Sequence, residues 1–224
     1  MSAVRRTNLA ALKKRGFRVA KSLPVARDGI DTLRPPREIA LRLMALDAVF
    51  TWVADEGPGA TTAKVRAYAK RNALAKWMTA EERRIFAQER AVARSVHVHT
   101  IGWKLENMWP LAWVLGMPRA PSVDGKMIPA SVRRAIIHEV LPKLGETVDV
   151  LLARAKVRSL GVVSKTEDLF YCAHNAARSA QLGGRTLPAK LDVVVAGGVI
   201  HERRHALTWC LSPGTRWDAT DLST

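Results

Sequence analysis

The stretch with the clearest chemical potential lies near the C-terminus, where residues 201–205 read His-Glu-Arg-Arg-His. Two histidines four positions apart project from one face of a helix, and H-E-x-x-H is a zinc-binding pattern of metalloproteases in which the glutamate acts as general base. A catalytic zinc also needs a third protein ligand, and the only carboxylates after His205 are Asp218 and Asp221. We therefore treat His201 and His205 as weak metal candidates and predict two partly exposed histidines without a catalytic zinc site.

The residues between the two histidines favour the same interpretation. They are Arg203 and Arg204, whereas the corresponding residues of such proteases are normally uncharged because that helix is buried. Helical spacing places Glu202 on the same side as Ala206 and Trp209. We therefore expect Glu202 to point inward as part of a structural ion pair.

A second candidate for acid–base chemistry is Glu106. Helical spacing places it in a wedge with Trp103, Pro110 and Trp113, which predicts an aromatic environment with little water. A carboxylate in such a place must be paired with a donor or remain protonated. We expect Glu106 to be buried and bonded to an arginine or to a backbone or indole N–H, and a structural role is favoured over a catalytic one.

A third group of polar residues follows one helix face. Asp168 and Tyr171 are one turn apart, Asn175 follows one turn later and Arg178 completes the face, while His174 is close in sequence but turned away. These side chains could line a polar pocket, or they could join helices through a buried hydrogen-bond network. The sequence leaves both alternatives open.

The elements that must position these side chains are predicted to be helices. Residues 34–38 place prolines and an acid where a helix begins, and apolar residues then recur at three and four positions. Thr79 and Glu82 have the spacing of a capping box, as do Ser164 and Glu167. Each box predicts a helix that starts at its first residue.

No segment shows strand alternation of useful length, and no internal repeat is present. The predicted fold is all-α, a single globular domain of about six to eight helices over residues 34–224. Residues 1–33 are predicted to form a basic N-terminal arm that packs on this domain or leads into it. Residues 95–115 and 131–158 are each expected to be helical, the second bent near Pro142.

The charge balance is strongly basic. The chain carries a net charge of +16, and its first 37 residues contain ten Lys or Arg against two Asp. A basic arm of this kind can contact polyanions without reading a sequence, through counterion release. No nucleic-acid-binding motif accompanies the charge, so specific recognition is the weaker alternative, as is an organelle transit peptide.

Apolar runs and cysteines bear on the compartment. The longest apolar stretch, near residues 192–200, is far shorter than the roughly 20 residues of a membrane span, and the N-terminus has no apolar secretory segment. Cys172 and Cys210 are far apart and belong to no paired motif, which is typical of reduced thiols. We expect a cytoplasmic protein without a membrane span.

Six segments in register resemble a bacterial family called domain of unknown function 4272. They extend from about Asn8 to Thr224 and read NLAALKKRGFRVAKSLP, LRPPREIALRLMAL, TAEERRIF, WKLENMWPLAWVLG, DLFYCAHNAAR and ERRHALTW followed by WDATDLST. The resemblance implies that the basic start belongs to the domain. It also implies a shared pattern at Glu38, Arg42, Trp103, Glu106, Asp168, Glu202, Arg203, Trp209, Trp217 and Asp218.

The same resemblance bears on residues 201–205. Glu202 and Arg203 belong to the shared pattern, whereas His201 and His205 do not, which argues further against a zinc site. The family brings no established activity, so the resemblance implies no catalytic assignment and no cofactor.

Three classes of function remain open. A non-enzymatic helical module that binds a protein or a small molecule is the preferred hypothesis, and the sequence identifies neither partner. The alternative is an enzyme with a helix-lined polar pocket, with a zinc hydrolase through residues 201–205 as a special case. Its candidates would be Glu106, Asp168, His174 and Glu202. A basic protein associated with nucleic acid is the third.

The residues expected to form a site fall into two sets. The candidate polar cluster comprises Glu38, Arg42, Glu106, Asp168, Tyr171, His174, Arg178, Glu202, Arg203 and Asp218. The aromatic side chains expected to line it are Trp103, Trp109, Trp113, Trp209 and Trp217. We expect no cofactor.

Overall fold

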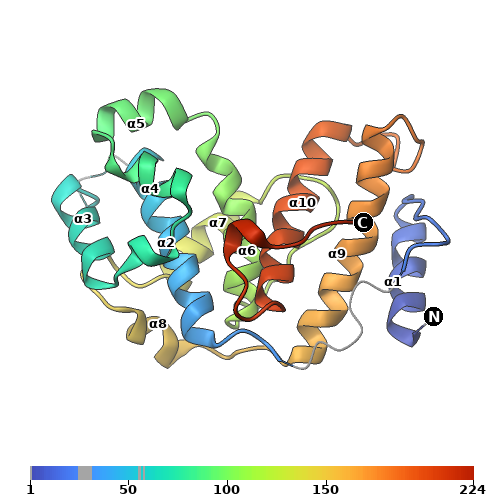
Figure 1. Ribbon diagram of the computed structural model, residues 1–224, viewed down its shortest axis with the longest axis horizontal. Coiled ribbons are helices and arrows are strands. Elements are labelled where there is room, and N and C mark those ends of the chain that lie inside the picture. The colour runs from blue at the N-terminus through green and yellow to red at the C-terminus, as the bar shows by residue number, and fades with distance from the viewer. Residues whose placement is uncertain (1, 25–31, 55–56, 58) are drawn as a thin grey trace. The chain divides into compact units, whose positions relative to one another are not determined.

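The structure, a computed structural model, describes residues 2–24, 32–54, 57 and 59–224 (Figure 1). Over these residues it contains ten α-helices and no β-strand, which confirms the predicted all-α class. The helices are α1 (Ala3–Lys14), α2 (Pro36–Ala54), α3 (Thr62–Arg71), α4 (Ala80–Ala87), α5 (Arg90–His97), α6 (Lys104–Val114), α7 (Ala130–Ala135), α8 (Val148–Arg154), α9 (Leu160–Gln181) and α10 (Val193–Cys210).

Short helical turns supplement these helices. They are the 3-10 turns η1 (Leu74–Trp77), η2 (Ile101–Trp103) and η4 (Trp217–Ala219), and the π-helix η3 (Ile136–Val140), which continues α7.

The described residues contain more helices than the predicted six to eight because two expected helices are divided. Residues 95–115 are split by η2 into α5 and α6. Residues 131–158 are split where the π-helix ends at Leu141, whose backbone is extended (φ −65°, ψ 146°). Leu141 precedes Pro142, and a residue before proline is driven out of the helical region. The expected bend is therefore a break.

The chain forms two compact units, each of which combines segments that are distant in sequence. Unit 1 consists of Met1–Arg34, Pro121–Met127 and Arg158–Thr224. Unit 2 consists of Pro35–Ala120 and Ile128–Val157.

Unit 2 is organised around α2. Of the 19 residues of α2, 14 are buried, so its apolar residues occur on every face and not on a single stripe. It packs against α3, α4, α5, α6 and α8. This central position makes α2 the element against which the other helices of the unit are placed.

Unit 1 is organised around α9, which packs against α10 and against α1 (Figure 1). Small side chains on α9, among them Ala173, Ala176 and Ala177, are buried and allow close packing of its neighbours. The described part of the predicted N-terminal arm therefore includes a helix, α1, that packs on α9 within this unit.

Helix starts follow the sequence signals in unit 2 but not at α9. Thr79 and Glu82 form both bonds of a capping box at the start of α4. The capping box expected from Ser164 and Glu167 is wrong, because α9 already begins at Leu160 after Ser159. Glu167 is instead buried in the middle of the helix, where it serves a tertiary contact.

Within the described residues, no helix combines the length and the apolar character that a membrane crossing requires.

Candidate functional site

The candidate residues lie in both units, and each group is described within its own unit. Unit 2 contains Glu38, Arg42, Trp103, Glu106, Trp109 and Trp113. Unit 1 contains Asp168, Tyr171, His174, Arg178, His201, Glu202, Arg203, His205, Trp209, Trp217 and Asp218.

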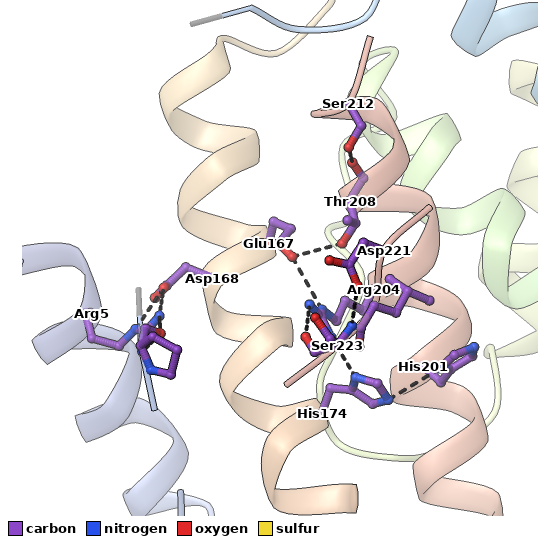
Figure 2. Close-up of polar contacts among 12 residues, drawn as sticks. Arg5, Glu167, Asp168, His174, His201, Arg204, Thr208, Ser212, Asp221 and Ser223 are labelled. Carbon is purple, nitrogen blue, oxygen red and sulfur yellow. Dashed lines mark hydrogen bonds and ion pairs between the residues drawn. The ribbon is translucent and has the colours of Figure 1, made fainter. Parts of the chain in front are cut away.

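The centre of the polar network in unit 1 is Arg204, which was not among the candidate site residues (Figure 2). Its side chain is 3% exposed, and its Nε lies 3.4 Å from Oε1 of Glu167 on α9. The same carboxylate oxygen accepts a hydrogen bond of 2.9 Å from the Thr208 hydroxyl. The buried charge of Arg204 thus has a buried counter-charge, as a dry site requires.

Arg204 also fixes the last residues of the chain. It donates to the carbonyl oxygens of Leu222 at 2.7 Å and Ser223 at 3.2 Å. Its guanidinium lies 4.7 Å from the centre of the Tyr171 ring, within the range of a cation–π contact. One side chain therefore joins α10, α9 and the C-terminal segment.

His174 receives a hydrogen bond from Arg204 that determines where its own hydrogen sits. Arg204 Nη1 lies 2.7 Å from His174 Nδ1, and an arginine can only donate, so Nδ1 accepts. The neutral ring then carries its hydrogen on Nε2, which lies 3.3 Å from Nδ1 of His201 and donates to it. Burial first, and then the charge of Arg204, lower the pKa of His174 from 6.5 to about 3. His174 therefore stays neutral at physiological pH.

The two histidines of the zinc-like motif have other partners. Both are half-buried, as predicted. His205 Nε2 lies 2.9 Å from the Trp217 carbonyl oxygen, and the rings of these residues are 4.3 Å apart. Trp217 in turn packs on Trp209. Among the residues described, no three His, Cys, Asp or Glu side chains are grouped so that they could hold a metal ion.

The expected exposure of the motif's charged residues requires a correction. Arg203 is fully buried and Arg204 nearly so, whereas Glu202, which was expected to point inward, is only half-buried. Arg203 donates to the carbonyl oxygens of Ser122 at 2.6 Å and Lys126 at 2.7 Å. The helix is buried despite its two arginines because each guanidinium has enough acceptors around it.

The polar face of α9 is divided among separate contacts. Asp168 accepts from Arg5 Nε at 2.8 Å and from Asn8 Nδ2 at 2.8 Å, and so attaches α1 to α9. Arg178 is exposed and bonds to Gln181 on its own helix. These contacts favour the hydrogen-bond network over the polar pocket as the role of Asp168.

The remaining acid among the unit 1 candidates, Asp218, is exposed and pairs with Arg216 at 2.7 Å. Asp218 lies in η4, and Arg216 is the residue directly before this turn. Asp218 therefore does not join the buried network around Arg204 through this ion pair.

In unit 2, Arg42 forms a buried ion pair with Glu82. The guanidinium contacts both carboxylate oxygens, at 2.5 and 2.9 Å, and both side chains are at most 1% exposed. Lys104 adds a third charge, 3.0 Å from Glu82 Oε1. Burial alone would raise the pKa of Glu82, but Arg42 and Lys104 outweigh it and lower the pKa to about 2. The carboxylate stays ionised and locks α2 to α4.

Glu106 is fully buried, and its Oε1 accepts a hydrogen bond of 2.7 Å from the backbone N–H of Ile128. Both facts agree with the prediction made from the aromatic wedge. Trp113 is buried and Trp103 is half-buried. Trp109 is buried and donates its indole N–H to the carbonyl oxygen of Arg119. These contacts hold the loop after α6 against the helix.

Unit 2 also contains a pocket that the sequence analysis did not predict, with a volume of about 410 Å³. Its lining comes from one end of α2 and from α7 with its π-helical continuation. The lining residues are Phe50, Thr51, Ala54, Ala130, Arg133, Arg134, Ile137 and His138. None of the residues proposed from the sequence as a site lines this pocket.

The two cysteines are not suited to nucleophilic chemistry. Cys172 and Cys210 are free and buried, and burial raises the pKa of each thiol to about 12. A thiol rather than a thiolate is therefore present at physiological pH.

Three residues that organise these sites were missed or misassigned from the sequence: Glu82, Glu167 and Arg204. Glu82 and Glu167 were recognised only as capping-box members, and Arg204 only as a charged residue between two histidines. The sequence signal that could have identified Arg204 and its partner was the predicted inward face of α10. An arginine on a buried helix implies a buried acceptor.

Comparisons with known proteins identify a family and nothing closer. No curated protein matches the chain. No solved structure matches it either. The family described as Domain of unknown function (DUF4272) matches residues 4–220. Because that match covers nearly the whole chain, the protein belongs to this family.

Proposed function

We propose that the protein is a non-enzymatic helical binding module and that the pocket between α2 and α7 is its ligand site. The observation that carries this proposal is that the pocket lining and the acid–base candidates are different residues, whereas an enzyme would combine them at one site. The pocket contains none of the acid–base candidates, and three of them, Glu106, Asp168 and His174, are engaged elsewhere in structural contacts.

The contacts of three acid–base candidates support a structural role for those three. Glu106 is fully buried and bonded to a backbone N–H. Asp168 is paired with Arg5. His174 is held neutral by burial and by Arg204, with its pKa lowered to about 3, far from the range in which a general base works at neutral pH.

The shape and lining of the pocket support ligand binding. Its volume of about 410 Å³ falls in the range of small-molecule sites, which are mostly apolar with a few polar groups. Two alanines, Ala54 on α2 and Ala130 on α7, stand in its walls, where larger side chains would fill the space. Phe50 and Ile137 supply larger apolar contacts.

A pocket-filling variant tests this proposal. Ligand-observed NMR would be recorded with a panel of neutral and anionic organic fragments on the full chain, on Ala130→Trp and on Ala67→Trp. Ala67 lies on the exposed face of α3 and is the matched control. We expect fragments that bind the parent and the control but not Ala130→Trp. If no fragment is lost in Ala130→Trp, the pocket is not the binding site.

A further inference from the structure

We infer that the ligand of the α2–α7 pocket is a small organic anion, a carboxylate or phosphate monoester joined to a compact apolar group. This inference rests on the proposed function and names the chemical class that the site would bind. The arrangement that carries it is a pocket with a cationic wall on α7 and an apolar wall that includes the end of α2.

The cationic wall follows from helical spacing. Ala130, Arg134 and His138 are four positions apart, and Arg133 and Ile137 form the adjacent row, so all five face the same side. Ile137 and His138 lie in the π-helix, where the N–H of Leu141 bonds to the carbonyl oxygen of Ile136, five residues earlier. Such widened turns occur frequently at functional sites.

The two arginines of this wall have free guanidinium groups. Both Arg133 and Arg134 are exposed, and within the part of the chain that the structure describes neither guanidinium forms a hydrogen bond or an ion pair. Two other arginines of unit 2 differ in this respect. Arg42 pairs with Glu82, and Arg90 donates to the carbonyl oxygens of residues at the end of α2. The pocket thus has two positive charges at its rim without a protein acceptor.

The α2 wall offers no comparable donor. The Thr51 hydroxyl lies 3.4 Å from Oδ1 of Asp47, which directs it toward that carboxylate and away from an incoming anion. The other α2 contributions, Phe50 and Ala54, are apolar. The anionic group should therefore lie against α7, near Arg133 and Arg134, and the apolar group against α2.

The chemistry of the wall selects the anionic group. An arginine presents its N–H donors in a planar fork that matches two oxygens of one carboxylate or phosphate. Two neighbouring arginines suit either group, and His138 adds an imidazole ring to the same wall. The volume of about 410 Å³ limits the apolar group to a single ring or a short chain.

The test uses three probes with the same phenylpropyl group: 4-phenylbutyrate, 3-phenylpropyl phosphate and the uncharged 4-phenylbutanamide. Their dissociation constants would be measured by calorimetry on the full chain, at low and at physiological salt. We expect both anions to bind at least tenfold more tightly than the amide, and their binding to weaken as salt increases. A preference between the two anions distinguishes a carboxylate ligand from a phosphate ligand.

Two double variants complete the experiment. Arg133→Gln/Arg134→Gln should weaken binding of the anions at least tenfold and leave the amide unchanged. The control Lys70→Gln/Arg84→Gln removes the same charge from exposed positions of α3 and α4 and should leave all three constants unchanged.

The outcomes separate this inference from the proposed function. If acid and amide bind equally and both are lost in Ala130→Trp, the pocket binds ligands but the inferred class is wrong. If the control weakens the anions as much as the arginine variant does, the attraction is a general effect of net charge and the inference is wrong. If none of the probes binds the parent, both proposals fail.

Discussion

The two units bury arginine in different ways. Five arginines are buried among the described residues. Arg42 lies in unit 2, and the other four lie in unit 1: Arg5, Arg34, Arg203 and Arg204. Arg42 donates hydrogen bonds to both carboxylate oxygens of Glu82. The arginines of unit 1 are bonded largely to backbone carbonyl oxygens of loops, helix ends and the C-terminal segment.

This difference reflects what each arginine connects. Arg42 joins two regular helices, most of whose carbonyl groups are used within the helices, so its acceptors are the Glu82 carboxylate and the carbonyl oxygen of Trp77 at the end of η1. In unit 1, Arg5 and Arg204 also have carboxylate partners on α9, but most acceptors of the buried arginines are carbonyl oxygens of irregular segments. Arg34, for example, donates to Trp209 at the end of α10 and to Thr215 beyond it, and lies over the Trp209 ring. There, arginine satisfies the last carbonyls of a helix.

The largest effect is expected in unit 2, from Glu82→Ala. This change leaves Arg42 buried without its carboxylate and should lower the free energy of unfolding by about 3–5 kcal/mol. The measurement is chemical denaturation of the full chain followed by circular dichroism. Glu81→Ala, at the exposed neighbouring position, is the control and should have little effect. If Arg42→Met/Glu82→Met is less stable than Glu82→Ala, the unpaired charge is not the cause.

The next effect is a pH dependence that arises in unit 1. The folded pKa of His174 is about 3 against an ordinary 6.5, so between these values the unfolded chain binds a proton that the folded chain excludes. Stability is therefore fully present above pH 6.5 and falls by about 1.4 kcal/mol per pH unit below it. Between pH 6.5 and 4.5 the loss should reach about 2.5 kcal/mol.

His174→Gln tests this dependence because its carboxamide oxygen can still accept from Arg204. Stability measured by denaturation from pH 7 to 4.5 should be flatter in this variant than in the parent. His201→Gln, which leaves His174 and Arg204 in place, should keep the parent's slope. Glu82, with its pKa lowered to about 2 from 4.5, adds a loss only below pH 4.5. A parent curve that is already flat above pH 4.5 would contradict the assignment.

A smaller effect is expected from Arg203→Met in unit 1. The change leaves the carbonyl oxygens of Ser122 and Lys126 without their donor, at a cost of about 1.5–2 kcal/mol, because this loop can turn toward water. Hydrogen exchange should increase in residues 121–127 more than in α9. Arg178→Met, at an exposed position of α9, is the control. Uniform exchange throughout unit 1 would show that Arg203 does not act on the loop specifically.

The smallest effects concern the helix caps of the two units. Asp192 accepts from the Val195 N–H at 2.8 Å at the start of α10, whereas Thr61 accepts from the Lys64 N–H at 3.4 Å at the start of α3. Asp192→Ala should cost about 1 kcal/mol and Thr61→Ala about 0.5 kcal/mol, since the shorter, charged cap also interacts with the helix dipole. Thermal denaturation of both variants measures the difference, and an equal or reversed order would count against it.

Local signals in the sequence were sufficient for much of the fold. Thr79 and Glu82 predicted the start of α4, and the aromatic wedge around Glu106 predicted a buried carboxylate. These features depend on residues three or four positions apart, whose relative placement is set by helix geometry alone. The candidate site was less accessible, because it depends on which helix faces lie against each other.

The sequence by itself thus determined the all-α class, the starts of α2 and α4 and the presence of charged residues on apolar faces. Only the tertiary structure decided which charges meet. Glu167 has capping-box spacing with Ser164, yet it lies in mid-helix with Arg204, and Ala54 and Ala130 form opposite walls of one pocket. Pairings of this kind join residues far apart in the chain, and burial selects them because an ionised group leaves water only where a partner is already in place.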